Sequence, residues 1–274
     1  MSSRLIPDIL YHYCSVDTFQ NIILSKVLWL SDLSKSNDSK EGKIAPERLG
    51  KWLQAKHNCS REECDFVYKL YEEWASRKHC LGTCFSNDGD LLSQWRGYGD
   101  DGRGIAIGFS SDWLSSLLAH PCEAPRKTAG LIPILYTEED QYDPIEAHLD
   151  DLARTISEDV RNDNPRATNA YATIFTIGSE ILYQYKDEFF KEELEWRIRC
   201  GTQGSKLLHR SINGKIIPYM EMPLHCEDLN HLNPISRLVL GPKNTVPEQI
   251  IKKLLESNGF KSDIRIERSK GSYQ

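Results

Sequence analysis

The 274-residue sequence predicts an α+β fold, built as one domain with two helical insertions. Short runs typical of β-strands are spread along the whole chain, and helical patterns lie between them. These patterns lack the regular β–α alternation of a doubly wound parallel sheet. Residues 45–78 and 143–185 carry helical periodicity alone. We therefore expect a single domain over residues 1–274, whose β core is interrupted at about these two stretches.

The first elements follow from their local patterns. The apolar and aromatic run at 9–16 is typical of a strand. A helix is expected next, because Ser15 or Asp17 can cap its N-terminus and apolar residues recur behind them at helical spacing, namely Phe19, Ile22 and Ile23. Residues 26–31 have the pattern of a second strand, and the polar cluster at 32–43 indicates a loop.

The middle of the chain contains two helices and two further strands. The helical stretch 45–78 is broken near "HNCS" at 57–60. Strand patterns at 80–86 and 103–110 flank a glycine-rich stretch that lacks the strand–GxGxxG–helix context of a dinucleotide-binding loop. We expect this stretch to form a hairpin turn rather than a phosphate cradle.

The second half of the chain continues the mixture. A short helix at 110–120 and a strand at 129–138 precede the helical region 143–185, which a break at 161–169 divides. The charged segment at 186–200 ends in an alternating strand pattern. The closing elements are a strand at 235–242, a helix at 246–259 with Pro247 in its first turn and Gly259 as its stop, and a strand at 262–269.

Composition and charge narrow the class of protein. Hydrophobic residues at 39% and charged residues at 27% are typical of a soluble globular protein. The net charge of −6 disfavours a broad nucleic-acid-binding surface, although it leaves room for a local basic groove. Apolar runs are too short for a membrane span, and the N-terminus lacks the apolar core of a signal peptide. We therefore expect a cytoplasmic protein with no membrane partner.

The cysteines are expected to be reduced thiols rather than disulfides or metal ligands. Eight of them are scattered through a long chain without a secretory signal. Two clusters offer soft zinc ligands: His57, Cys59 and Cys64, and His79, Cys80 and Cys84. Neither has the short C-x-x-C spacing of a metal knuckle, and the residues between them have a helical pattern. Thiols are therefore favoured over zinc, and no metal is expected.

Three clusters of side chains are candidates for chemistry. The first is His12 between Tyr11 and Tyr13 in the opening strand. Neighbouring residues of a strand point to opposite faces. His12 can therefore face a cleft while the two tyrosines pack, or it can be a structural histidine with its hydrogen bonds satisfied.

The second cluster places two aromatic rings and an arginine on the glycine-rich stretch. Trp95 and Tyr98 are three residues apart, so that a helical turn puts them on one side. A planar ring there can stack on a flat ligand, and Arg96 can meet a phosphate. The alternative is an aromatic pair that fills the core beside a surface arginine.

The third cluster is "EELEWR". If Glu193 and Glu195 both lie in a strand, their side chains share one face and Trp196 packs on the other. Paired carboxylates can hold a hydroxyl group or stabilise a developing cation. The alternative is a solvated run of charges at the start of a strand.

In order along the chain, four blocks resemble the bacterial domain-of-unknown-function family 2971. They are "LYHYCSVDTFQNIILSKVLWLSD…SNDSKE", "CFSNDGDLLSQWRGYGDDGRGIAIGF", "FKEELEWRI" and the closing "ISRLVLGPK…IIKKLL…IRI". This family resembles a distant branch of the ADP-ribosyltransferase fold of the His–Tyr–Glu type. The resemblance implies a split mixed or antiparallel β core with helical insertions, and NAD⁺ as a substrate.

The resemblance also implies roles for individual residues. His12 would bind a ribose hydroxyl of NAD⁺, Tyr98 would stack on the nicotinamide, and Trp95 would support or replace Tyr98. Glu195 would bind the 2′-hydroxyl of the nicotinamide ribose, with Glu193 as the competing candidate or as the group that orients or deprotonates the acceptor. Tyr13 and Ser86 complete the expected cofactor-binding residues. Arg96 or Arg103 would meet the pyrophosphate.

Three functions are compatible with these residues. The first is transfer of ADP-ribose from NAD⁺ to a protein or nucleic acid, as a bacterial toxin or phage-defence effector with a neutralising antitoxin or defence-system partner. The second is hydrolysis of NAD⁺, and the third is a catalytically inactive module that binds a nucleotide or a protein. Retention of His12, Tyr98 and a late glutamate together favours an active enzyme.

Overall fold

The computed structural model describes most of the chain. The described residues are 5–35, 42–76, 80–120, 129–136, 150–156, 168–181, 183–202, 206–212, 214–229, 231–261 and 263–273. Contacts divide the chain into two compact units. We call residues 32–80 and 134–190 the helical unit, and residues 5–31, 81–133 and 191–274 the sheet unit.

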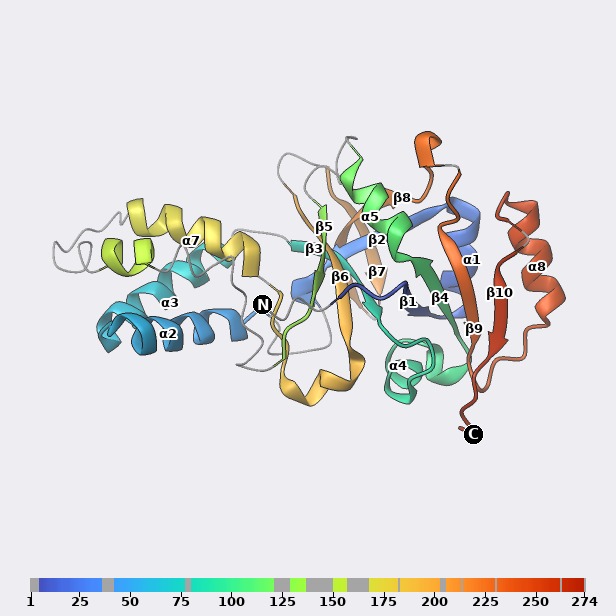
Figure 1. Ribbon diagram of the computed structural model, residues 1–274, viewed down its shortest axis with the longest axis horizontal. Coiled ribbons are helices and arrows are strands. Elements are labelled where there is room, and N and C mark those ends of the chain that lie inside the picture. Colours follow the sequence, from blue (N-terminus) through green and yellow to red (C-terminus); the bar gives the residue numbers. More distant parts are fainter. Residues whose placement is uncertain are drawn as a thin grey trace. The chain divides into compact units, whose positions relative to one another are not determined.

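One mixed sheet organises the sheet unit (Figure 1). Its main path has the order β10-β9-β4-β1-β3-β2-β8-β7, and β6 pairs with both β3 and β5 beside that path. The pair β9–β10 is parallel, whereas β1–β4, β4–β9, β2–β8, β5–β6 and β7–β8 are antiparallel. The strands are β1 (Ile9–Cys14), β2 (Val27–Asp32), β3 (Cys80–Ser86), β4 (Ile105–Ser110), β5 (Ala129–Pro133), β6 (Glu195–Gly201), β7 (Leu208–Ile212), β8 (Lys215–Pro223), β9 (Ile235–Leu240) and β10 (Arg265–Arg268).

Short helices connect these strands. They are α1 (Val16–Ser25), α4 (Leu92–Gly97), α5 (Ser111–Ala119) and α8 (Glu248–Ser257), with 3₁₀ turns at η2 (Asp100–Gly102) and η5 (Glu227–Leu229). The 3₁₀ turn η1 (Leu33–Lys35) belongs to the helical unit, and the 3₁₀ segment η4 (Glu188–Glu193) begins in the helical unit and ends in the sheet unit. Local sequence explains α1 well. The Ser15 side chain caps its N-terminus by accepting a hydrogen bond from the Thr18 amide. Its buried face is the expected set Phe19, Ile22 and Ile23.

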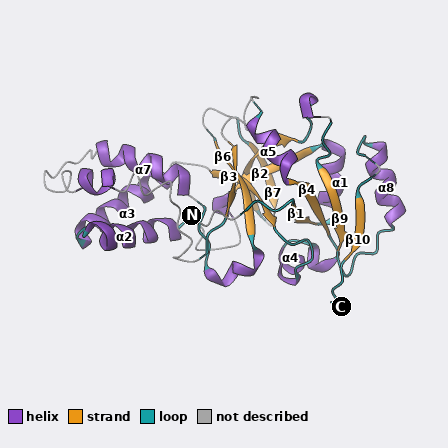
Figure 2. Ribbon diagram, in the orientation of Figure 1, coloured by secondary structure: helices purple, strands orange, loops and turns teal. Residues whose placement is uncertain are grey.

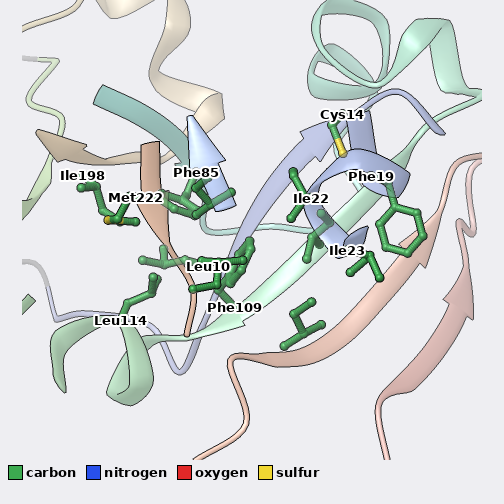
Figure 3. Packing of buried hydrophobic residues seen from close by; sticks show 14 of the residues in the cluster. Leu10, Cys14, Phe19, Ile22, Ile23, Phe85, Phe109, Leu114, Ile198 and Met222 are labelled. Atoms are coloured by element: carbon green, nitrogen blue, oxygen red, sulfur yellow. The ribbon is translucent and has the colours of Figure 1, made fainter. Parts of the chain in front are cut away.

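The principal hydrophobic core lies against one face of the sheet. Leu10 of β1 lies beside Phe85 of β3 and Phe109 of β4 in this core, whereas Cys14 lies nearer to Phe19 and Ile22 of α1 (Figure 3). The Phe85 and Phe109 rings pack edge to face with their centroids 5.9 Å apart. Ile198 and Met222 join them from β6 and β8, so that distant strands share one apolar interior.

The regular elements of the helical unit are helices (Figure 2). They are α2 (Ile44–His57), α3 (Arg61–Ser76) and α7 (Thr168–Ile181), and residues 150–156 are also helical. Trp74 of α3 packs on the Phe175 ring of α7 with centroids 6.2 Å apart. A Cβ at Gly178 would come within 2.7 Å of the Trp74 ring, so that glycine permits this close approach. The expected pair of helices broken near residues 57–60 is confirmed.

The sequence prediction of an α+β class with a mixed sheet is confirmed, and one element was predicted wrongly. The stretch between β3 and β4 is not a hairpin turn, because β1 lies between these two strands in the sheet. The stretch instead contains α4 and η2, and Trp95 of α4 packs over the face of β1 that carries Tyr11 and Tyr13. The family block at 36–41 and the helical residues expected at 143–149 and 157–167 lie outside the described residues. Among the described helices, none is both long and apolar enough to cross a membrane.

Candidate functional site

A hollow in the sheet unit collects most of the residues that the sequence singled out. Its empty volume is about 340 Å³, part of which is open to solvent. The lining residues come from β1, β3, α4 with its C-cap, the end of η4 and the start of β6: His12, Tyr13, Cys84, Phe85, Gln94, Tyr98, Glu193 and Glu195. Three segments that are far apart in the sequence therefore meet here.

Sheet geometry explains why the hollow lies at β1. This strand is paired with β4 along all six of its residues, but with β3 at one position, where Tyr11 faces Ser86. The two strands thus diverge away from that position, and backbone groups near the divergence need other partners. The His12 side chain provides one, because its Nδ1 lies 2.9 Å from the Cys84 carbonyl oxygen.

His12 is held as a neutral imidazole. Burial lowers its pKa below 6.5, although the hydrogen bond to the Cys84 carbonyl acts in the opposite direction. A carbonyl oxygen can only accept, so Nδ1 carries the proton and Nε2 is left as an acceptor. The ring also packs edge-on against Phe85, with centroids 6.0 Å apart. His12 can therefore accept a hydrogen bond from a hydroxyl group of a ligand.

Tyr13 and Trp95 form a rigid layer behind the site. Their rings pack edge to face with centroids 4.7 Å apart. The Tyr13 hydroxyl donates to the Asp88 carbonyl oxygen and accepts from the Leu91 amide, and burial strongly raises its pKa. Tyr13 lines the hollow, but its hydroxyl group is hydrogen-bonded to the loop that precedes α4.

The two candidate stacking rings have different positions. Trp95 is 1% exposed, and its indole N–H donates to Asp90 at 2.8 Å. Its ring is part of a small core with Tyr11 and Tyr13, so it cannot replace Tyr98 at a ligand and it supports Tyr13 instead. Tyr98 is 44% exposed and lines the hollow. Of the two rings, the geometry leaves Tyr98 as the one that a flat ligand can reach.

Glu193 and Glu195 meet at the hollow by a different route from the one predicted. They do not share a continuous strand, because Glu193 ends η4 and Glu195 begins β6. Leu194 between them has φ +46°, a left-handed conformation that is rare for a branched residue. The carboxylates are nevertheless both buried and both line the hollow, while Trp196 packs in the principal core as expected.

Ser86 fixes the position of Glu193. Its buried hydroxyl donates to the Glu193 carbonyl oxygen at 2.8 Å, and it accepts from the Asp88 amide at 3.2 Å. Ser86 is absent from the lining of the hollow. Ser86 was expected among the cofactor-binding residues. In the structure, its hydroxyl instead positions the backbone of Glu193, a candidate catalytic residue.

Glu195 forms a buried ion pair that the sequence analysis missed. The Arg197 Nε atom lies 2.6 Å from Glu195 Oε1, and both side chains are almost fully buried. The signal was present in the sequence, because residues i and i+2 of a strand lie on one face. A charge-assisted hydrogen bond at this distance restrains the carboxylate. Arg197 is thus a positioning residue for Glu195.

The two arginines expected at a pyrophosphate lie away from the lining of the hollow. Arg96 is exposed on α4, and its guanidinium lies 5.9 Å from the centroid of the Tyr273 ring. Arg103 is exposed and binds the Asp100 carboxylate in η2. Neither residue is brought to the carboxylates and His12. The sequence around Arg96 and Arg103 has no pattern that indicates whether an arginine faces the hollow or the solvent.

The cysteine clusters at 57–64 and 79–84 do not appear as metal-ligating groups in the described part of the chain. Cys59 and Cys64 are buried, and the Cys64 thiol donates to the Gly50 carbonyl oxygen. His79 lies outside the described residues. Cys84 is half-buried at the hollow, where its carbonyl oxygen lies 2.9 Å from His12 Nδ1.

Comparison with known proteins gives one match. Residues 94–198 match the model of a family described as a protein of unknown function (DUF2971). The match supports the family resemblance expected from the sequence over those residues. It includes Trp95, Tyr98, Glu193 and Glu195, whereas His12 precedes it. No curated protein and no solved structure matches the chain.

Proposed function

We propose that this protein transfers ADP-ribose from NAD⁺ to a macromolecular acceptor, either a protein or a nucleic acid. The observation that carries the proposal is the meeting of His12, Tyr98, Glu193 and Glu195 at one hollow. These are the residues to which the resemblance to His–Tyr–Glu transferases assigns roles. We place the nicotinamide riboside end of NAD⁺ at this hollow, because the four side chains line it.

The proposed roles follow from the state of each side chain. Neutral His12 accepts a hydrogen bond at Nε2 from a ribose hydroxyl, since its Nδ1 proton is used by the Cys84 carbonyl. Tyr98 stacks on the nicotinamide ring from its exposed position at the end of α4. Glu195, restrained by Arg197, accepts a hydrogen bond from the 2′-hydroxyl of the same ribose.

The proposed reaction is a substitution at the anomeric carbon of the ribose. The bond between this carbon and the nicotinamide nitrogen breaks, and its electron pair leaves with the now neutral nicotinamide. Positive charge develops on the ribose, and the fixed Glu195 carboxylate stabilises it electrostatically. A lone pair of the acceptor forms the new bond to the anomeric carbon, and the proton of the acceptor passes to Glu193.

A toxin or defence role, and a neutralising partner, belong to the same proposal and depend on the acceptor. Hydrolysis is the variant in which water is the acceptor. An inactive module that only binds a nucleotide or a protein would release no nicotinamide at all.

Incubation of the purified chain and a cell lysate with NAD⁺ labelled in its adenosine part separates these three outcomes. Label on a macromolecule, labelled free ADP-ribose, and unchanged NAD⁺ correspond to the three functions, and nuclease or protease treatment then identifies the acceptor.

The first prediction concerns the two carboxylates. We expect Glu195→Gln to lower the rate of nicotinamide release by about 10²–10³-fold, because it removes a fixed charge that acts on the transition state. Glu193→Gln is expected to lower transfer to the acceptor more than release of nicotinamide. Both rates are measured with the labelled NAD⁺.

Glu192→Gln is the matched control, because Glu192 is an exposed neighbour in η4 that does not line the hollow. It should keep the rates of the unaltered protein. The variant of Glu195 leaves the Arg197 charge buried, so thermal unfolding must show that the protein is folded at the assay temperature. Undiminished transfer in folded Glu195→Gln and Glu193→Gln proteins would contradict the proposed mechanism.

A further inference from the structure

Three side chains with metal-binding atoms come together far from the hollow described above. They are His120, Cys226 and Asp228, whose ligand atoms all lie within 4.8 Å of one another. His120 Nε2 is 2.8 Å from Asp228 Oδ2. They are the sole group of three such residues within the residues that the structure describes. His120 and Cys226 are half-buried, and Asp228 is exposed.

The backbone holds these side chains in place without help from a metal. His120 is the C-cap of α5, where its amide donates to the Ser116 carbonyl oxygen at 3.1 Å. Cys226 directly precedes η5, and its carbonyl oxygen accepts from the Leu229 amide at 3.0 Å. The helix end and the 3₁₀ turn are in contact with each other. The three ligand atoms are therefore positioned by regular structure rather than by free loops.

We propose that His120, Cys226 and Asp228 bind a zinc ion that joins the end of α5 to η5. Imidazole, thiolate and carboxylate are all common zinc ligands, whereas Mg²⁺ and Ca²⁺ prefer oxygen atoms alone. Metal–ligand distances of about 2.0–2.3 Å place the ligands of a tetrahedral zinc site about 3.5 Å apart, so the three groups need to move by about an ångström. A water molecule takes the fourth position.

Access and charge support the same assignment. Cys226 and its neighbour His225 line a second hollow of the sheet unit, with an empty volume of about 560 Å³, so an ion can approach Cys226 from solvent. A thiolate and a carboxylate together neutralise the charge of Zn²⁺. On binding, the Cys226 thiol and the His120 Nε2 atom must lose their protons, which pass to solvent.

Metal binding tests the proposal without reference to NAD⁺. The full chain is stripped with a chelator under reducing conditions and titrated with Zn²⁺ against a chromophoric competitor, and bound metal is measured by elemental analysis. We expect about one zinc ion per chain and a higher unfolding temperature with zinc, because an ion that binds the folded state stabilises it. Co²⁺ in place of zinc should give a thiolate-to-cobalt charge-transfer absorption.

Substitutions locate the site. Cys226→Ser and His120→Ala should each weaken zinc binding at least about 100-fold, since even loss of a residue that only orients a ligand costs 10–100-fold. Cys226→Ser should also abolish the charge-transfer band and the zinc-dependent rise in unfolding temperature. Asp228→Ala, with its more exposed side chain, should weaken binding and keep the band.

His57→Ala and Cys59→Ser are matched controls and should bind zinc as the unaltered chain does. His57 also faces an aspartate, with its Nδ1 3.6 Å from Asp150 Oδ1, but this pair belongs to no group of three ligands in the described residues. The proposal is overturned if the chain binds no zinc, or if Cys226→Ser and His120→Ala bind it with unchanged affinity. Loss of zinc in Cys59→Ser alone would move the site to the other cysteine cluster and would equally overturn it.

Discussion

At the scale of single residues, Trp95 and Tyr98 lie three positions apart but differ in burial, because Trp95 is in the core and Tyr98 is exposed at the hollow. A separation of three residues does place both side chains along α4 and its C-cap. It does not say which ring enters the core. Trp95 is buried because Tyr13 packs on it and Asp90 accepts its indole N–H. Both partners come from outside the helix, so the sequence left the two rings as alternatives.

A second prediction separates the two rings. We expect Tyr98→Ala to raise the KM for NAD⁺ about 5–100-fold, because stacking of a base on an aromatic ring contributes about 1–3 kcal/mol. Tyr98→Phe keeps the ring and should keep the KM within about twofold of the original, since the loss of a hydroxyl leaves the stacking face intact. Nicotinamide release over a range of NAD⁺ concentrations measures both values.

The control for this prediction is Trp95→Phe. It should lower the free energy of unfolding, because the ring is fully buried and its N–H bond to Asp90 is lost, while leaving the KM of folded protein nearly unchanged. An effect of Trp95→Phe on KM as large as that of Tyr98→Ala, or no effect of the latter, would assign the stacking role to a different residue.

At the scale of elements, the parts that the sequence predicted correctly are those that depend on local signals. They include the cap and apolar face of α1, the break between α2 and α3, and the strand patterns of β1 to β4. Each of these is determined by residues within the element or directly beside it. Three features were missed. They are α4 with η2 in place of a hairpin, the antiparallel pair β7 and β8, and the left-handed Leu194 that separates η4 from β6.

The end of the chain anchors the loop that leads to α4. The Asp90 carboxylate accepts hydrogen bonds from the Ser269 hydroxyl, the Lys270 amide and the Trp95 indole, at 2.5, 2.8 and 2.8 Å. Burial acts to raise the pKa of Asp90, but these hydrogen bonds and the Lys270 charge outweigh it, so the pKa lies below its ordinary value. Residues just after β10 are therefore fastened to the element that carries Tyr98.

A third prediction tests this anchor. We expect Asp90→Ala to lower the free energy of unfolding by about 1–3 kcal/mol, because three donors lose their acceptor. Amide hydrogen exchange should also become faster in α4 and in residues 269–273, since both segments lose a fixed partner. Urea denaturation and hydrogen exchange with mass spectrometry measure the two effects.

Asp65→Ala is the control, because Asp65 is an exposed residue of α3 and its removal should change stability by less than about 0.5 kcal/mol. If Asp90→Ala leaves both the stability and the exchange in α4 as they were, the three hydrogen bonds do not anchor the loop. Asp90→Asn should fall between the two, since an amide oxygen still accepts but carries no charge.

At the scale of the whole molecule, the sequence predicted the class of fold and where the helices concentrate. The stretches expected to be insertions supply the helices of the helical unit. The order of the strands could not be predicted. Pairing between β1 and β4, or between β3 and β6, joins residues far apart in the sequence and leaves no local pattern in it. The site was predicted in part: His12, Tyr98 and both glutamates meet, while Arg197 was overlooked and Arg96 lies elsewhere.

Stability at alkaline pH depends on thiols that lie in the core of the sheet unit. Burial raises the pKa of the Cys14 thiol from 9.0 to about 12, and does the same for Cys200. Both side chains belong to the principal core, where Cys14 donates to the Ile105 carbonyl oxygen at 3.6 Å. The unfolded chain loses these protons above about pH 9, whereas the folded chain keeps them. The folded state then binds more protons, so its stability falls as the pH rises.

The last prediction measures this dependence. Between about pH 9 and pH 10, we expect each thiol to lower the free energy of unfolding by about 1.4 kcal/mol per pH unit, and Tyr13 to add a further loss above pH 10 because burial raises its pKa as well. Urea denaturation from pH 7 to pH 11 under reducing conditions gives the slope. Cys14→Ala creates a cavity that lowers stability at every pH, but it removes one titrating group and should reduce the slope by about 1.4 kcal/mol per pH unit. Ile23→Ala should keep the slope, because it creates a cavity in the same core without removing a titrating group. An equal slope in Cys14→Ala and the unaltered protein would show that the thiol ionises as easily in the folded core as in the unfolded chain.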